Sequence, residues 1–325
     1  MPLPEKSLIA QIRNLAKVRD RGRTSRIPVG IGDDCAVLRL IPRSDTLLTT
    51  DFTLEGIHFR RDWHTPESVG HRCLARGLSD IASMGGEPVA AFLSLALPRD
   101  LPQSWVGRFT RSLISLAEKH GVQLAGGDTA ESPNGILADI VVVGSVPKGK
   151  AIRRATARAG DRIYVSGELG GSAQAVLQMR AKPKKQLNPG EYPRHFFPEP
   201  RLEVGRILRE KCLATAMIDT SDGLSTDLAH ICEESHVGAE ISADLIPRAR
   251  AGKPAREVDL DLALHGGEDY ELLFTVSAGK RIPQQIAGVP LTQIGQVTRA
   301  RGIFVSNPKG VAYELHPKGW EHFRR

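Results

Sequence analysis

The stretch PVAAFLSLALP, residues 88–98, is an uninterrupted apolar run that is closed by Pro98. Its length and composition predict a buried β-strand. Apolar residues at helical spacing precede it in residues 68–85 and follow it in residues 104–121. A buried strand between two amphipathic helices is typical of an α/β fold in which helices cover a sheet.

The same alternation extends along the whole chain. The helix at 104–121 is expected to begin with Ser104 as its N-cap. The segment PKGK, residues 147–150, has the composition of a hinge. We therefore predict two α/β domains, residues 1–147 and 148–325, each a sheet with a layer of helices. The other expected elements are strands at 46–56, 122–128, 136–146, 161–167 and 271–276, helices around 201–212 and 224–235, and a Pro-rich surface excursion at 182–198.

The composition is that of an ordinary globular protein, with 325 residues of which 41% are apolar and 25% charged. No apolar run approaches the roughly 18 residues of a membrane helix, and the start of the chain lacks the apolar core of a signal peptide. The four cysteines are scattered without a CxxC spacing. This argues against a disulfide framework and against a structural zinc site. We expect a cytoplasmic protein with no membrane partner.

The chain has 44 Lys and Arg against 37 Asp and Glu, a formal net charge of +7. Such an excess serves solubility, a preference for anionic small molecules, or nucleic-acid binding. Aromatic residues make up only 5% of the chain and do not interleave with the basic clusters. The pattern therefore does not favour base stacking, and we expect small-molecule ligands rather than nucleic acid.

Acidic residues recur at turns marked by glycine, next to apolar strands or helices. In GIGDDCAVL, residues 30–38, two carboxylates stand side by side, where like charges repel. A cation held against them would relieve that repulsion. The full set is Asp33 and Asp34, Asp51, Asp80, Asp128, Asp219 and Asp222, and Glu268 and Asp269.

Carboxylates gathered at the ends of strands favour a hard cation, of which Mg²⁺ is the usual one. No His or Cys group has the spacing of a transition-metal site. Mg²⁺ held by carboxylates commonly serves a phosphorylated substrate. At any single turn the alternative is purely structural, because Asp and Gly are common turn residues.

Two glycine-rich segments are candidates for phosphate binding. GSVPKGKA, residues 144–151, is one residue short of a P-loop and has Ala151 where Ser or Thr should bind the metal. SGELGGSAQAVLQM, residues 166–179, fits better, because a glycine turn leads into a helix whose first N–H groups could face an anion. A tight turn into a helix is the structural alternative there.

Taken in order, these segments resemble the thiamine-monophosphate kinase family, within the superfamily of aminoimidazole ribonucleotide synthetase. The resemblance runs from SLIAQI at 7–12 to KGWEHF at 318–323, and TTDFTLEGIHF at 49–59 with GGEDYELLFTV at 266–276 separates the kinases from their relatives. It implies ATP-dependent phosphorylation of thiamine phosphate to thiamine diphosphate, with several Mg²⁺ ions and no P-loop. Because no Ser, Cys or His of the sequence stands in a recognisable nucleophile–base arrangement, we expect direct in-line transfer with no catalytic nucleophile. The resemblance also implies a homodimer whose N-terminal domains pair into a β-barrel, beside a C-terminal α/β domain.

Position by position, the resemblance implies three sets of site residues. Because Arg153 precedes Arg154, either arginine could reach ATP, and Ala130 stands where the family more usually has Thr. The implied metal ligands are Asp34, Thr49, Thr50, Asp51, Asp80, Asp128, Asp219 and Asp222; the ATP contacts are Gly127, Asp128, Arg154 and Ser221; the thiamine phosphate contacts are His58, Glu268 and Trp320.

The three implied substrate residues each have a structural alternative. His58 lies in a glycine-flanked turn, which favours exposure in a cleft, although a solvated turn histidine would look the same. Trp320 could stack on an aromatic ring or pack in the core, and Glu268 could bind an aminopyrimidine or begin a strand. For the whole chain, the alternatives are another ATP-using synthetase of the superfamily and a non-catalytic protein of that fold.

Overall fold

The computed structural model describes residues 1–17, 26–32, 35–183, 186–307 and 309–319. The chain divides into two compact units. The N-terminal unit comprises residues 1–81, 87–149 and 183–186, and the C-terminal unit comprises residues 82–86, 150–182 and 187–325.

A four-stranded sheet forms the centre of the N-terminal unit, in the order β1 (Ser44–Leu54), β4 (Leu137–Pro147), β2 (Glu87–Pro98) and β3 (Gln123–Ser132). Strand β4 is antiparallel to β1 and β2, whereas β3 runs parallel to β2. The apolar run of residues 88–98 lies in β2, which has a neighbour on each side. Leu93, Leu95 and Leu97 are at most 4% exposed, so the prediction of a buried strand is confirmed.

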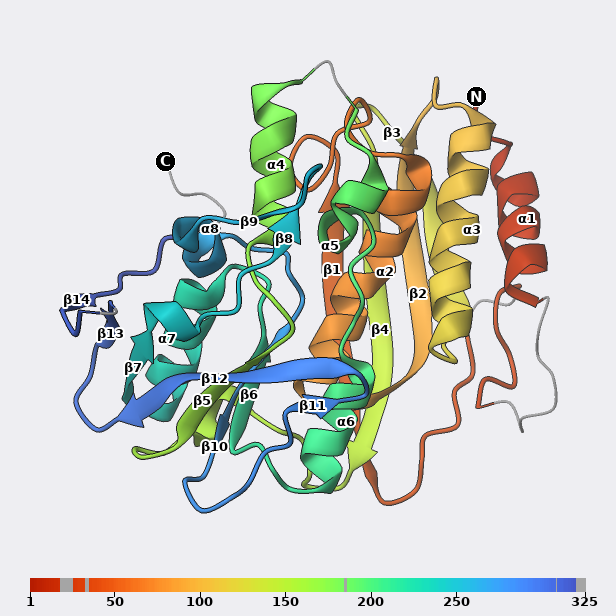
Figure 1. Cartoon of the computed structure of the whole chain (residues 1–325). Coiled ribbons are helices and arrows are strands. Elements are labelled where there is room, and N and C mark those ends of the chain that lie inside the picture. The colour runs from red at the N-terminus through yellow and green to blue at the C-terminus, as the bar shows by residue number, and fades with distance from the viewer. Residues whose placement is uncertain (18–25, 33–34, 184–185, 308, 320–325) are drawn as a thin grey trace. The chain divides into compact units, whose positions relative to one another are not determined.

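The helices α2 (Pro66–Ser83) and α3 (Gln103–Lys119) lie on one face of this sheet, and α1 (Glu5–Lys17) packs beside α3 and β3 (Figure 1). Helices α2 and α3 approach each other closely at Gly70 of α2, where a Cβ would lie 2.1 Å from the carbonyl oxygen of Phe109 on α3. Leu74 of α2 and Leu113 of α3 are fully buried. Glycine at position 70 therefore sets how deeply the two helices interlock.

The prediction of Ser104 as an N-cap is wrong. Helix α3 begins one residue earlier, at Gln103, and Pro102 occupies the N-cap position without a side-chain hydrogen bond. Proline is tolerated at a helix start because its ring fixes φ and the first turn leaves its backbone N–H groups unpaired in any case.

A larger sheet forms the centre of the C-terminal unit. Adjacent strands are antiparallel except β7 and β13, which are parallel. The order is β14 (Ala312–Glu314), β13 (Ile303–Ser306), β7 (Gly238–Ser242), β12 (Val289–Thr298), β5 (Arg162–Ser166), β10 (Leu272–Val276) and β6 (Ala216–Asp219), with β11 (Gln285–Ile286) paired to β12 and a separate hairpin of β8 (Arg250–Ala251) and β9 (Arg256–Glu257).

Helices pack on both faces of this second sheet. On one face, Leu228 of α7 and Leu264 of α8 share a core with Val165 of β5. On the other face, Leu208 of α6 packs in a core with Phe274 of β10. The prediction of a mixed α/β fold with two domains is confirmed at this level. The helices are α4 (Gly171–Ala181), α5 (Pro193–Phe196), α6 (Leu202–Glu210), α7 (Leu224–Ser235) and α8 (Leu260–His265), with 3-10 turns at Arg154–Thr156, Pro189–Glu191 and Ala243–Leu245.

The prediction of a surface excursion at residues 182–198 is wrong for its second half. Tyr192, His195 and Phe196 are 7%, 2% and 1% exposed. The short helix α5 turns these rings inward, and His195 packs edge-on against Phe196 with 5.0 Å between the ring centroids. The polar, Pro-rich composition of the segment concealed this aromatic contribution to the core.

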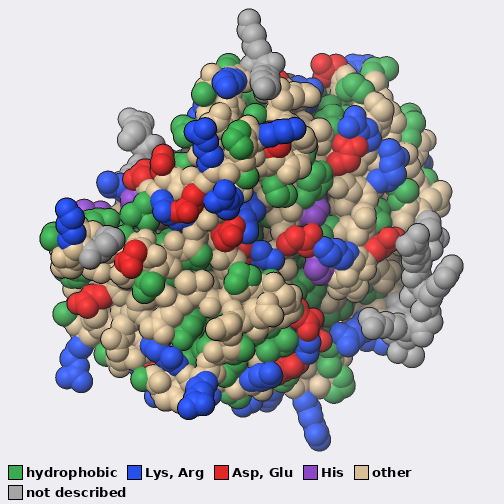
Figure 2. Space-filling model, in the orientation of Figure 1, with side chains coloured by type: hydrophobic (Ala, Val, Ile, Leu, Met, Phe, Trp, Pro, Cys, Tyr) green, Lys and Arg blue, Asp and Glu red, His purple; other side chains and the backbone are tan. Residues whose placement is uncertain are grey.

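The described residues also bear on membrane insertion, disulfide bonding and surface charge. Within the described ranges, no helix has the length and apolarity to cross a membrane. Cys35, Cys73, Cys212 and Cys232 are all free thiols. On the face shown in Figure 2, basic and acidic side chains are interspersed, and neither sign dominates.

Candidate active site

The N-terminal acidic group joins strand β1 to helix α2. Thr49 on β1 donates a hydrogen bond from Oγ1 to Oδ2 of Asp80 on α2. Asp51, two residues further along β1, is close enough to Asp80 for that carboxylate to raise its pKa. The structure thus brings together three of the predicted metal positions.

Asp51 is the carboxylate in this group that is most perturbed. Burial, followed by the nearby charge of Asp80, raises the pKa of Asp51 to about 6, although Arg76 acts in the opposite direction. Nε of Arg76 lies 3.8 Å from Oδ1 of Asp51, too far for a hydrogen bond. Oδ2 of Asp51 is buried and has no hydrogen-bond partner in the described part of the chain. An unpaired, buried carboxylate oxygen beside a second carboxylate is a setting that a divalent cation would satisfy.

Asp139 on β4 lies near this group, and the sequence reasoning missed it. It is paired with Phe52 and therefore points, with Thr50, to the opposite face of the sheet from Thr49 and Asp51. Thr50 donates a hydrogen bond from Oγ1 to Oδ1 of Asp139 at 2.7 Å, and Asp139 adds to the raised pKa of Asp51. The available signal was an acid in the middle of the apolar strand ILADIVVVGSV, residues 136–146. A half-buried acid in such a strand needs a partner.

Gly127 and Asp128 lie on strand β3. Gly127 has φ of +146°, and a Cβ there would lie 1.8 Å from the carbonyl oxygen of Leu93 on β2, so only glycine fits. Asp128 is exposed, and its Oδ1 accepts a hydrogen bond from the N–H of Thr129 at 2.8 Å. By strand register, Asp128 lies across β2 from Asp139. It therefore shares a row of the sheet with the acid that Thr50 contacts.

His58 lies in the turn that follows β1. Its Nδ1 accepts a hydrogen bond from the N–H of Leu54 at 3.0 Å, and the N–H of His58 donates to the carbonyl oxygen of Leu54 at 2.9 Å. Gly56 permits this turn with φ of +86°. Because Nδ1 is an acceptor, neutral His58 carries its proton on Nε2.

The donors of the N-terminal group suit Mg²⁺ in kind but do not complete a site. Among the described residues, no group of three or more His, Cys, Asp or Glu side chains is arranged to hold a metal ion. Asp33 and Asp34 lie outside those residues. The gathered side chains offer hydroxyl and carboxylate oxygens, the ligands that Mg²⁺ prefers, and Mg²⁺ usually completes its shell with water and phosphate oxygens.

In the C-terminal unit, the loop after β6 pairs with the turn before β10. The N–H of Glu268 donates to the carbonyl oxygen of Ser221 at 2.8 Å, and the N–H of Tyr270 donates to that of Thr220 at 3.0 Å. Gly267 permits the approach, since a Cβ there would lie 2.4 Å from the carbonyl oxygen of Ser221. The pairing places the predicted nucleotide position 221 beside the predicted substrate position 268.

Three acids follow each other around this loop. Asp219 ends β6 and is 2% exposed, and Asp222 is half-buried. Asp227 in the first turn of α7 was not predicted. Burial, followed by the charges of Asp219 and Asp222, raises the pKa of Asp227 well above its ordinary range.

The turn at residues 266–271 directs neighbouring acids to different partners. Glu268 and Tyr270 have φ of +64° and +52°, a region that costs side chains of this kind about 1–3 kcal/mol each. Asp269 between them is 5% exposed and accepts hydrogen bonds from the N–H groups of Gly170 at 2.6 Å and Ser172 at 3.1 Å. These contacts help to hold the strained turn in place.

Of the two interpretations of residues 166–179, the structure favours the structural one, a tight turn into a helix, over phosphate binding. The helix N-terminus within residues 166–179 is occupied by the chain's own carboxylate, Asp269, which supplies the negative charge that such a site favours. Burial raises the pKa of Asp269 to about 7, even though its two backbone hydrogen bonds lower it.

Glu271 forms a buried ionic centre that the sequence reasoning also missed. It is 0% exposed and accepts hydrogen bonds from Nε of Arg201 at 2.6 Å, from Arg194 at 2.9 Å and from Oγ of Ser166 at 2.7 Å. Two guanidinium groups on one buried carboxylate satisfy its charge. Glu271 thereby links the end of β5 at Ser166 and the segment 194–201 to the turn that carries Glu268.

The two arginines at the start of the C-terminal unit are not distinguished by the structure. Arg153 and Arg154 are both exposed. Their backbones are fixed, because the carbonyl oxygen of Arg153 accepts from the N–H of Met217 at 3.3 Å and that of Arg154 accepts from Oγ of Ser235 at 2.7 Å. Either side chain remains a candidate for a nucleotide contact.

Trp320 lies outside the described residues, but the residue before it reaches the site loop. The N–H of Gly319 donates to Oγ1 of Thr226 at 3.1 Å. A Cβ at Gly319 would lie 2.1 Å from the carbonyl oxygen of Asp222. The C-terminal segment therefore packs directly on the 219–227 loop.

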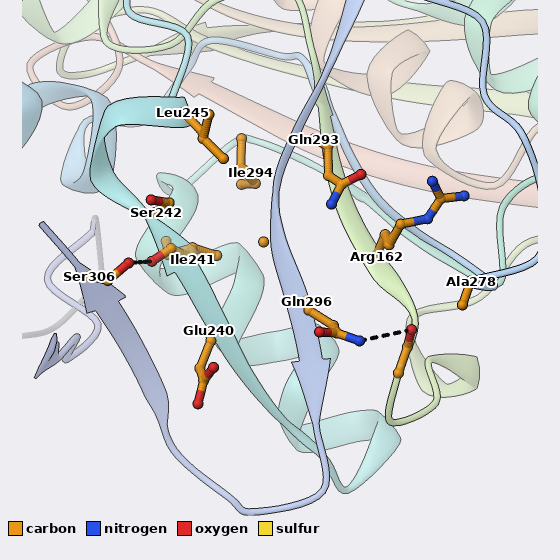
Figure 3. A pocket seen from close by; sticks show the side chains of 12 residues that line it. Arg162, Glu240, Ile241, Ser242, Leu245, Ala278, Gln293, Ile294, Gln296 and Ser306 are labelled. Atoms are coloured by element: carbon orange, nitrogen blue, oxygen red, sulfur yellow. Dashed lines mark hydrogen bonds between the residues drawn. The ribbon is translucent and has the colours of Figure 1, made fainter. Parts of the chain in front are cut away.

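A separate depression of about 380 Å³ lies on the C-terminal sheet (Figure 3). Arg162, Glu240 and Gln296 line it from three adjacent strands, on the face opposite α7. None of the predicted site residues lines it, so it is distinct from the loops described above.

Comparisons with known proteins define the class to which this fold and these loops belong. The family model "AIR synthase related protein, N-terminal domain" matches residues 32–146, and "AIR synthase related protein, C-terminal domain" matches residues 158–306. Thiamine-monophosphate kinase of Salmonella typhimurium is 39% identical over 325 residues, covering 95% of this chain and 97% of the relative.

Solved structures agree with this assignment. Thiamine-monophosphate kinase from Stenotrophomonas maltophilia K279a superposes with a TM-score of 0.79 at 34% identity, covering 94% of this chain and 97% of that one. A structure described as AaThiL complexed with AMPPCP and TMP gives a TM-score of 0.76 at 33% identity, covering 87% and 89%. The chain belongs to the thiamine-monophosphate kinases, within the AIR synthase-related family.

Proposed function

We propose that this protein catalyses the ATP-dependent phosphorylation of thiamine phosphate to thiamine diphosphate. The observation that carries the proposal is its similarity, over 87% of the chain, to a structure complexed with AMPPCP and TMP. AMPPCP is a non-transferable analogue of ATP, so that relative holds a donor and an acceptor at once. The paired loops at residues 221 and 268 agree with a nucleotide position beside a substrate position.

We infer that Mg²⁺ is held by oxygen donors in each unit. In the N-terminal unit the donors are Thr49, Thr50, Asp51 and Asp80, with Asp34, Asp128 and Asp139 as further candidates; in the C-terminal unit they are Asp219 and Asp222. The unpaired Oδ2 of Asp51 supports this assignment. When bound, Mg²⁺ neutralises the charge of the phosphate oxygens during transfer.

The remaining residues position the two substrates. Gly127, Arg154 and Ser221 are assigned to the nucleotide, and His58, Glu268 and Trp320 to thiamine phosphate. The attacking group is a phosphate oxygen, which is ionised near neutral pH and needs no strong base. His58 with its proton on Nε2 suits hydrogen-bond donation to a phosphate oxygen better than proton abstraction.

The open face of β1 supports a homodimer formed through the N-terminal sheet. Leu48 and Phe52 are 71% and 54% exposed. They lie two residues on either side of Thr50, so both point, with Thr50, to the face opposite Thr49 and Asp51. Large apolar side chains together on one exposed strand face are typical of an interface. Pairing of two such sheets would close the barrel that the family resemblance implies.

A direct assay tests the proposed reaction. Purified protein with thiamine phosphate and Mg-ATP should yield thiamine diphosphate and ADP, detected by mass, and chelation of Mg²⁺ should abolish the product. Formation of ADP with an acceptor other than thiamine phosphate, and none with thiamine phosphate, would instead favour another ATP-using synthetase of the superfamily. ATP binding without turnover of either compound would favour a non-catalytic member of the fold.

A further inference from the structure

The carboxylate of Asp227 lies against the loop that carries Ser221 and Asp222. Asp227 belongs to the first turn of α7 and is 1% exposed. Its Oδ2 accepts hydrogen bonds from the N–H of Asp222 at 3.2 Å and from the N–H of Gly223 at 2.9 Å. Both amides lie beyond Ser221, where the pairing with residues 268–271 ends.

Within the part of the chain that the structure describes, the N-cap position of α7 contributes no side-chain hydrogen bond. The N-cap residue is Gly223, which has no side chain to accept a hydrogen bond. In a capping box, an acidic or amide side chain one turn into the helix reaches back to the N–H of the N-cap residue. Asp227 makes this reverse contact from the fourth helical position, and extends it by one residue to Asp222.

The surrounding backbone leaves the loop little freedom apart from this contact. Gly223 has φ of +113°, and a Cβ there would lie 2.8 Å from the carbonyl oxygen of His265. The carbonyl oxygen of Asp222 is approached by Gly319. Asp227 therefore holds the N–H of Asp222, while Gly319 packs closely against the carbonyl oxygen of the same residue.

We propose that Asp227 is a positioning residue for phosphoryl transfer, which orients Asp222 toward a divalent cation and Ser221 toward the nucleotide through the two amides it binds. This inference rests on the function proposed above. The role requires an acceptor oxygen, which Oδ2 provides, and does not require a negative charge. Precise placement of a ligand-bearing loop depends on such supporting hydrogen bonds.

Two substitutions of Asp227 test this role by calorimetric binding of Mg-AMPPCP, without any acceptor present, and Asp222→Asn serves as the reference for loss of a direct ligand. Asp227→Asn keeps an acceptor oxygen and should bind within about threefold of the parent. Asp227→Ala removes it and should bind about 10- to 100-fold more weakly, the effect of losing hydrogen bonds to a buried carboxylate. The matched control is Asp261→Asn, in the first turn of α8, where the side chain is 83% exposed; it should bind as the parent does.

Two results of the binding series would overturn the proposal. If Asp227→Asn binds as weakly as Asp222→Asn, the charge itself is needed and Asp227 is a direct ligand. If Asp227→Ala melts at a lower temperature but binds Mg-AMPPCP as the parent does, the residue is only a helix cap. Hydrogen exchange on the parent gives a check independent of variant folding, because the amides of Asp222 and Gly223 should be protected before nucleotide is added, and rapid exchange there would refute the contact.

The proposed reaction is tested by a measurement that is independent of the Asp227 variants. Turnover of thiamine phosphate by the parent tests that reaction, whereas the binding series tests Asp227 alone. A parent that binds Mg-AMPPCP but leaves thiamine phosphate unchanged would refute the reaction and leave the binding comparison intact.

Discussion

Nε of Arg76 on α2 lies 3.8 Å from Oδ1 of Asp51 on β1. This guanidinium is a cation that the chain itself brings to the acidic group, and it opposes the rise in the pKa of Asp51 without cancelling it. The residual repulsion among Asp51, Asp80 and Asp139 is what a bound metal ion would relieve.

Removal of one charge should therefore stabilise the metal-free protein. The pKa of Asp51 in the folded chain is about 6, above the ordinary 3.8, so the free energy of unfolding falls as the pH rises from 3.8 to about 6 and is constant above. At pH 7.5, Asp51→Asn should be more stable than the parent by roughly 1–3 kcal/mol, or several degrees in Tm. The difference should vanish near pH 4.

Thermal scans of parent and variant check this, with Asp100→Asn, an exposed turn residue, as the control. Mg-ATP should raise the Tm of the parent more than that of Asp51→Asn, because binding stabilises the state that binds. A variant that melts well below the parent without metal would show that Asp51 is structural.

His58→Asn should raise the KM for thiamine phosphate by about tenfold and lower kcat less, since the residue orients the acceptor rather than removing its proton. Asn can still accept from the N–H of Leu54, which preserves the turn. Steady-state kinetics measure both constants, and His316→Asn, at an exposed position, should change neither. A loss of kcat by several orders of magnitude at constant KM would assign proton transfer to His58.

Transfer should proceed in one in-line step without a phosphoenzyme. Ser172 and Ser225 each contact a histidine at 2.8 Å, His195 and His265 respectively. Both serines are at most 1% exposed, so neither hydroxyl is open to a substrate as an activated nucleophile would be. With a γ-phosphate made chiral by oxygen isotopes, the configuration at phosphorus should be inverted in thiamine diphosphate. Net retention is the outcome that this mechanism does not allow.

Phe52→Glu should convert the protein to monomers, because a charge on the open face of β1 would be buried in the proposed interface. Sedimentation velocity measures the change in mass. Leu177→Glu is a suitable control, since Leu177 on α4 is 48% exposed, and it should leave the oligomeric state unaltered. A parent that already sediments as a monomer would refute the dimer.

The elements that the sequence predicts best are those in which one short-range pattern determines the structure. The apolar run at residues 88–98 forms β2. The helical spacing of apolar residues after Gly223 predicts a helix around 224–235, and α7 spans those residues. The prediction of Ser104 as the N-cap of α3 failed because the start of a helix depends on only one or two residues. Pro102 already occupies the N-cap position.

The site was predictable as a set of residues but not as a set of contacts. The hydrogen bond between Thr50 and Asp139 joins residues 89 positions apart, and only the register of β1 with β4 brings them together. Glu268 and Asp269 look alike in sequence, yet a left-handed backbone at residue 268 sends the second acid to α4. Whether one of two neighbouring acids is buried depends on such backbone detail, which local patterns do not specify.

Asp269 occupies the N-terminus of α4 as a covalently attached competitor of any free anion. A covalently attached group competes at an effective concentration on the order of millimolar or more, so a free phosphate has little chance of displacing it from the amides of Gly170 and Ser172. A phosphate group that binds to this chain must therefore find its hydrogen-bond donors elsewhere than at these two amides.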